Sequence, residues 1–164
     1  MLNRFFSTDT SWVLLVQRVV LGLVILPHGL QKLFGAFGGY GFAGSMAFFT
    51  DTIGAPAPVG LLVIVSDSLG ALALILGLGT RLAAFGTIAT MLGAVLLWHL
   101  PNGFFMNWDG AQAGEGFEFH LLAIALAVPL AIKGGGAYAI DRVLARFLVR
   151  PVVPGAQVGR MVRA

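Results

Sequence analysis

The sequence predicts an all-α fold: an integral membrane bundle of four helices, with an outer interfacial segment and a cytoplasmic amphipathic helix near the C-terminus. Three observations support this prediction. Hydrophobic residues make up 58% of the 164 residues and charged residues only 10%, where soluble domains carry about 25% charged residues. Glycine, at 23 residues, is as frequent as closely packed membrane helices require. Four long apolar runs are present, and a chain this short cannot cover four such helices in a soluble core.

Each apolar run approaches the ~20 residues that a helix needs to cross a bilayer. The first follows Arg4, but its apolar part is longer than that of a signal peptide. It also ends in His28 and Lys32 rather than in a cleavage site, so we expect it to be retained. The last run is short and contains Pro129, which predicts a tilt or a kink. The predicted spans are 12–33, 58–79, 82–100 and 117–133, in a single domain over 1–164.

The segments between the spans also carry structural information. Residues 34–57 are rich in Gly and Phe and too apolar for a solvated loop, so 42–53 is predicted to be a short helix in the membrane interface or a cap over the bundle. The loop 101–116 contains Trp108 and suits an interfacial turn. Residues 137–149 resume helical spacing with an apolar and a basic face, which predicts a helix on the anionic inner leaflet or a basic tail without a partner.

The distribution of basic residues predicts the orientation. With four spans, both termini and the turn at 78–80 lie on one side of the membrane, and the two loops on the other side contain no Lys or Arg. Because basic loop residues stay in the cytoplasm, both termini are predicted to face the cytoplasm. The net charge of +3 therefore requires no nucleic-acid partner. The basic residues on the predicted inner side are Arg4, Arg81, Lys133, Arg142, Arg146, Arg150, Arg160 and Arg163.

A second group of polar residues lies within or at the ends of the spans, where ionisable groups are costly and indicate function. Side chains on helices lean toward the helix N-terminus. Asp67 on the second span therefore leans outward, while His28 and Lys32 on the first span lean inward toward it; Arg18 is a less favourable partner for Asp67. The candidate ligand or proton cluster is Arg18, His28, Lys32, Asp67, His99, Glu118 and His120.

Three interpretations of this cluster remain open from the residues. It can be a set of ion pairs and hydrogen bonds that fixes the packing of the helices. It can be a proton-linked site in which imidazole and carboxylate groups bind a quinone or a small polar molecule. It can also be a metal or haem site built from His28, His99 and His120, although these come from three helices without a local ligand motif. The chain contains no Cys, which excludes thiolate chemistry.

The order of several short motifs resembles the DoxX family of small four-helix bacterial membrane proteins, with which DoxD-like quinone oxidoreductase subunits are grouped. The similarity covers roughly residues 18–141, and the chain departs from the family's common Glu at Asp67 and from a Ser before the closing Leu-Asp at Ala139-Ile140. The motifs are Arg18-x3-Gly22, His28-Gly29-x2-Lys32, Gly54-Ala55-Pro56-Ala57-Pro58, Leu76-Gly77-Leu78-Gly79-Thr80-Arg81, Asn107-Trp108, Gly114-Glu115-Gly116-Phe117-Glu118 and Gly134-Gly135-Gly136-Ala137-Tyr138-Ala139-Ile140-Asp141.

The resemblance implies a redox-associated membrane subunit that binds quinone or a similar lipid-soluble molecule, together with other membrane subunits or as a homo-oligomer. In this hypothesis His28 and His120 exchange protons, and Arg18 anchors the cluster electrostatically. The groups that set the charge of the two histidines are Lys32, Asp67 and Glu118. Without Cys, the chain carries electrons only with a bound cofactor or a partner, so a quinone-linked oxidoreductase would be a complex rather than this chain alone. The alternatives are a non-catalytic accessory or assembly subunit, and a solute transporter, for which the chain lacks an inverted repeat.

Overall fold

The computed structural model describes residue 6 and residues 8–148, and within them every regular element is a helix. This confirms the predicted all-α class. Three continuous helical runs, Trp12–Phe34, Ala57–Leu76 and Thr80–Asn102, are long and apolar enough to cross a membrane. The fourth predicted span is the helix α7 (Glu118–Lys133), whose 16 residues are fewer than in the other three runs. Its crossing of the bilayer stays a prediction.

The helical runs are not uniform along their lengths. The first run is one helix, α2 (Trp12–Phe34). The second consists of α4 (Ala57–Val65), the π-helix η3 (Ser66–Gly70) and α5 (Ala71–Leu76). The third consists of α6 (Thr80–Ala94), the π-helix η4 (Val95–His99) and the short 3-10 helix η5 (Leu100–Asn102).

The segment between the first two runs forms a cap over one end of the bundle. It contains η1 (Ala36–Gly38), α3 (Gly41–Ala47) and a further π-helix, η2 (Phe48–Thr52). The cap packs against α2 and α4, as one of the two predictions for this segment expects. Its α3 and η2 together cover 41–52, close to the predicted short helix over 42–53. The location of this helix in the membrane interface stays a prediction. Gly35 ends α2 in the left-handed conformation, with φ of 73°, which glycine adopts without strain.

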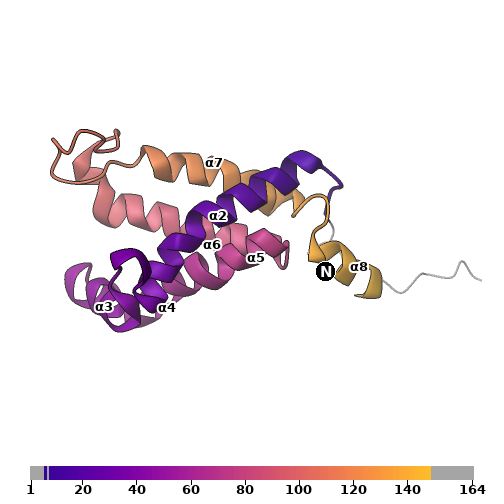
Figure 1. Cartoon of the computed structure of the whole chain (residues 1–164), viewed down its shortest axis with the longest axis horizontal. Coiled ribbons are helices and arrows are strands. Elements are labelled where there is room, and N and C mark those ends of the chain that lie inside the picture. Colours follow the sequence, from indigo (N-terminus) through magenta and orange to yellow (C-terminus); the bar gives the residue numbers. More distant parts are fainter. Residues whose placement is uncertain (1–5, 7, 149–164) are drawn as a thin grey trace, which may run out of the picture.

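The helices pack most closely in the half of the bundle away from this cap. There α6 lies along α7, and α2 lies along α5. Gly22 permits the second contact, because a Cβ atom at this position would stand 2.8 Å from the Ala71 carbonyl oxygen. At the other end, the cap with α4 and the end of α6 diverge from one another (Figure 1). The bundle is therefore closed at one end and splayed at the other.

A buried arginine joins three elements at the closed end. Arg18 is 2% exposed and donates hydrogen bonds to the carbonyl oxygens of Leu74, at 2.9 Å, and Ile75, both in the last turn of α5. It also donates to Gly135 at 2.8 Å and Ala137 at 3.3 Å, in the connection after α7. Helix C-termini carry unpaired carbonyls and a partial negative charge, so a guanidinium satisfies both at once.

Asp141 provides a second set of polar contacts at the closed end, with backbone amides in place of carbonyls. Its two carboxylate oxygens accept hydrogen bonds from the backbone amides of Gly79, at 2.6 Å, and Thr80, at 2.9 Å. These amides begin α6, where an acidic cap is favourable. Asp141 is itself 2% exposed. The turn between the second and third runs is thus held by one cation and one anion from distant parts of the chain.

The C-terminal amphipathic helix starts later than predicted. The structure places α8 at Ile140–Leu148, whereas the apolar spacing predicts a start at residue 137. Gly136 and Tyr138 have positive φ values of 76° and 53°, which no right-handed helix includes, and the Ala137 amide bonds to the Ser11 carbonyl at 3.0 Å. Residue 149 of the predicted helix and the basic residues Arg4, Arg150, Arg160 and Arg163 lie outside the described residues.

We predict that Arg18→Met lowers the thermal unfolding midpoint of the detergent-solubilised protein strongly, by the equivalent of roughly 3 kcal/mol. The substitution leaves four carbonyl groups without their buried charged donor. The matched control is Arg146→Met, which removes the same charge from an exposed position on α8. Equal midpoints for the two variants would contradict this role for Arg18.

Candidate functional site

The splayed end of the bundle contains a cavity of about 1100 Å³. Its walls come from α2, the cap, α4 with η3, α6 with η4, and the start of α7, and most of them are apolar. The lining also continues along α5 and the first turns of α6 as far as Leu78 and Gly79, in the turn at the closed end. Five of the seven residues of the candidate cluster line it: His28, Lys32, Asp67, His99 and His120. Arg18 and Glu118 are not among the lining residues.

The central polar feature of the cavity is an ion pair between two spans. Lys32 Nζ lies 2.8 Å from Asp67 Oδ2; the lysine side chain is 26% exposed and the aspartate side chain 3%. The pairing agrees with the opposite leans expected for side chains on antiparallel helices. A carboxylate buried to this degree in an apolar bundle needs a cation close to it.

The backbone brings this pair together by close helix contact. Gly29 of α2 sits directly on the backbone of η3: a Cβ atom there would overlap the carbonyl oxygen of Asp67 and stand 2.5 Å from the Cα of Ser68. Only glycine allows this approach. Lys32 follows one turn later on the same helix, in the last turn of α2, where a cation is favourable.

Asp67 lies in a π-helical turn, and so do other cavity residues. The three π-helices η2, η3 and η4 each contribute lining side chains, among them Phe49, Ser66, Asp67 and Trp98. A π turn inserts one extra residue, which shifts the faces of the helix relative to each other, and such turns are frequent at functional sites. All three described π-helices border one cavity, which marks it as the candidate site.

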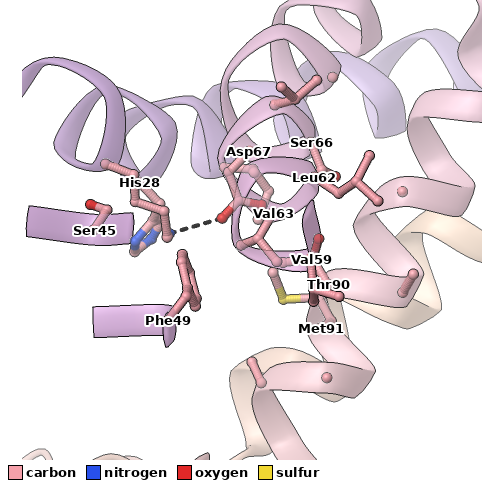
Figure 2. A pocket seen from close by; sticks show the side chains of 18 of the residues that line it. His28, Ser45, Phe49, Val59, Leu62, Val63, Ser66, Asp67, Thr90 and Met91 are labelled. Atoms are coloured by element: carbon pink, nitrogen blue, oxygen red, sulfur yellow. Dashed lines mark hydrogen bonds and ion pairs between the residues drawn. The ribbon is translucent and has the colours of Figure 1, made fainter. Parts of the chain in front are cut away.

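Two oxygen atoms beside the ion pair have no hydrogen-bond partner among the described residues. They are Asp67 Oδ1 and Ser66 Oγ, and both are buried. Figure 2 shows Asp67 facing the cavity across from His28, with Ser66 one residue before it on η3. Buried polar atoms of proteins are almost always paired. The free hydrogen-bonding capacity here is typical of a binding site rather than of a packing contact.

The histidines occupy two different walls. His28 projects from α2 into the cavity beside Ser45 and Phe49 of the cap (Figure 2), and its ring centre lies 6.1 Å from that of Phe119. The rings of His99, on η4, and His120, on α7, are 4.2 Å apart. His99 Nδ1 is 2.8 Å from the Glu115 carbonyl oxygen.

The arrangement of the three histidines tests the alternative of a metal site built from His28, His99 and His120. Among residue 6 and residues 8–148, no group of three or more His, Asp or Glu side chains lies close enough to hold a metal ion. His99 and His120 form a ring pair, and Phe119 has ring contacts with both His120 and His28. The donor geometry does not fit a three-histidine metal site.

The two remaining candidates have other roles. Arg18 binds backbone carbonyls at the closed end, so it does not anchor the cluster in the way the sequence predicts. Along α2, Arg18 lies beside the end of α5, whereas Asp67 lies in η3, the segment that precedes α5. Glu118 accepts hydrogen bonds from the Met106 amide at 3.1 Å and from Trp108 Nε1 at 3.3 Å. It therefore holds the loop 101–116 in place.

Several lining residues were missed from the sequence. Ser45 and Phe49 belong to the cap, and Ser66, Thr90 and Trp98 face the cavity from the second and third runs. The sequence signal for Ser66 was its position directly before Asp67. The others are uncharged residues in apolar surroundings, and a pattern of charges does not detect them.

The fold and the cavity define a class: small helical membrane proteins with a polar ion pair inside an otherwise apolar bundle. The chain belongs to the DoxX family, whose sequence profile matches residues 13–100, more than half of the chain. It is also 27% identical over 140 residues to the "Putative oxidoreductase CatD" of Bacillus subtilis (strain 168), covering 85% of this chain and 90% of that protein. No solved structure matches the chain.

We predict that Gly29→Ala destabilises the protein by about 1–3 kcal/mol, the usual cost of overpacking, because the new methyl group would overlap the backbone of η3. The control is Gly93→Ala, where a Cβ atom would meet nothing within 4 Å. Thermal unfolding in detergent measures both variants. If Gly29→Ala is as stable as Gly93→Ala, the close contact between α2 and η3 does not exist.

Proposed function

We propose that this protein binds a quinone or a similar lipid-soluble carbonyl compound in the cavity, as the membrane subunit of a redox system. The observation that carries the proposal is a large apolar cavity in the spanning region whose wall contains a buried aspartate paired with a partly exposed lysine. Apolar walls with a few placed polar groups are typical of small-molecule sites. A volume of about 1100 Å³ exceeds what one aromatic ring needs, which leaves space for an apolar substituent.

Lys32 is the group best placed to hold an acceptor oxygen. An ammonium group has three N–H donors, and the bond to Asp67 at 2.8 Å occupies one of them. Its side chain is partly exposed while that of Asp67 is buried. Asp67 therefore orients the ammonium, and the remaining donors are available to a carbonyl oxygen of the ligand.

The histidines are suited to proton exchange with such a ligand. His28 and His120 both line the cavity, and imidazole is the side chain that most readily gives and takes protons near neutral pH. Reduction of a quinone to a quinol consumes two electrons and two protons. In this proposal the protons pass through the histidines, and the electrons come from the redox centre of a partner protein.

The need for a partner follows from composition. The chain has no Cys, so it holds no disulfide, thiolate or cysteine-bound cluster that could carry electrons. The word "oxidoreductase" in the name of the related CatD protein agrees with a redox context. A purely structural accessory subunit is the competing function, and it predicts no ligand in the cavity.

We further propose a bacterial inner-membrane location with both termini in the cytoplasm. The described basic residues Arg81, Lys133, Arg142 and Arg146 belong to the closed end, at the start of α6, the end of α7 and α8 (Figure 1). The polar residues of the cavity, Lys32, His99 and His120 among them, lie toward the other end of the bundle. By the positive-inside rule the cavity then faces the outer leaflet.

Decylubiquinone should quench the fluorescence of the purified protein in a saturable way, through Trp98. This residue lines the cavity, whereas Trp12 and Trp108 do not. Trp98→Phe keeps the other two indoles and should abolish the saturable component, leaving only the linear quenching caused by quinone in the micelle. Saturable quenching that survives Trp98→Phe would refute binding in this cavity.

The double variant Lys32→Met/Asp67→Asn should weaken decylubiquinone binding by about tenfold or more, the equivalent of losing one hydrogen bond from a charged donor. Removing both partners avoids leaving a single charge buried. Lys133→Met, at the closed end, is the matched control. Unchanged binding in the double variant would show that the ion pair does not hold the ligand.

A further inference from the structure

The cavity opens sideways between the second and third helical runs. Its lining includes Leu62 of α4, which is 66% exposed, and Leu97 of η4, which is 60% exposed. Both belong to runs that are long and apolar enough to cross a membrane, where exposed leucine side chains are favourable next to lipid. The same cavity lining includes Ser66 and Asp67. Exposed apolar side chains of two spanning runs therefore border the cavity that contains the ion pair.

The cavity also extends along Leu82 and Phe85 toward the closed end. The gap between α6 and α4 lies on the other side of Gly86, where α6 separates from η3. At Gly86 the two runs touch: a Cβ atom there would stand 2.9 Å from Ser66 Oγ. Gly93 lies seven residues further along α6, on the same helix face and ~10 Å nearer the splayed end. It also lines the cavity, but a Cβ atom there would meet nothing within 4 Å. The helices are thus in contact at one position and apart two turns later.

We propose that this gap is a subsite for the apolar tail of a membrane-resident ligand, whose polar head lies at the Lys32–Asp67 pair. The inference rests on the proposed function and specifies it: the ligand class is a quinone-like head on a long aliphatic chain, which enters from the bilayer. The tail passes Gly93, and Leu62 and Leu97 flank the opening to lipid.

The physical basis is packing rather than hydrophobic transfer. Moving an aliphatic chain from lipid into an apolar gap changes its surroundings little, because lipid tails are as apolar as leucine. The gain comes from dispersion contacts in a narrow space and from the covalent tether, which keeps the head near its site. A phospholipid acyl chain can fill the same space, but a phospholipid has no quinone head, so it does not produce a preference for a tailed over a tailless quinone.

The test compares decylubiquinone with the same dimethoxy-methyl-benzoquinone lacking a tail, in nanodiscs of fixed lipid composition. Binding is followed by Trp98 quenching, with concentrations expressed per lipid. In the wild type the tailed compound should bind about tenfold more tightly. Gly93→Leu should remove this advantage while leaving the affinity for the tailless compound unchanged, because the new side chain fills the gap but not the head site.

Two controls separate the gap from general effects. Gly93→Ala adds a methyl group where there is open space and should retain the advantage of the tail. Ala125→Leu adds the same bulk to an exposed position on α7 that does not line the cavity, and it should also bind like the wild type. A measurement without substitution is photolabelling with a diazirine at the end of the decyl tail, which should mark α6 and η4 around Gly93 and Leu97.

Equal affinities for the tailed and tailless quinones in the wild type would overturn the tail subsite while leaving the proposed function intact. An advantage that persists in Gly93→Leu, or labelling spread evenly over all lipid-facing helices, would overturn it as well. Failure of both compounds to bind would overturn the proposed function together with this inference.

Discussion

The ion pair between Lys32 and the buried Asp67 is the constraint on which the splayed half of the structure depends. A carboxylate with 3% of its side chain exposed, in a bundle with the composition of a membrane protein, is stable only next to a cation. Bringing that cation within 2.8 Å requires the first and second runs to approach until only glycine fits between them, which Gly29 provides. The π turn around Asp67 then directs its carboxylate to the lysine and to the cavity.

Polar contacts hold the helices together at the closed end of the bundle, while the other end is splayed. At the closed end, Arg18 and Asp141 satisfy the unpaired backbone groups of the turn between α5 and α6. Arg81 donates to the carbonyls of Ala131 and Ile132 near the end of α7. With one end held by these contacts, the other can splay and still belong to one bundle. The cavity is therefore a consequence of where the polar contacts are placed along the helices.

Sequence reasoning located the ion pair, because the lean of side chains on antiparallel helices depends only on helix geometry and on approximate depth. It placed Arg18 in the same cluster, since depth along α2 does not reveal that the guanidinium meets the carbonyls at the end of α5. Glu118 was grouped with His120 by proximity in sequence, but its carboxylate binds the loop amide of Met106. The π turns follow from tertiary packing and leave no apolar period that a pattern could detect.

In the proposed site, Lys32, oriented by Asp67, donates a hydrogen bond to a carbonyl oxygen of the bound ligand. Infrared difference spectroscopy of carbonyl-labelled decylubiquinone bound to the protein detects this bond, because hydrogen bonding weakens the C=O bond. One carbonyl band should move to lower wavenumber on binding to the wild type, and this shift should be lost in Lys32→Met/Asp67→Asn. Carbonyl bands identical to those of the quinone in protein-free lipid would contradict it.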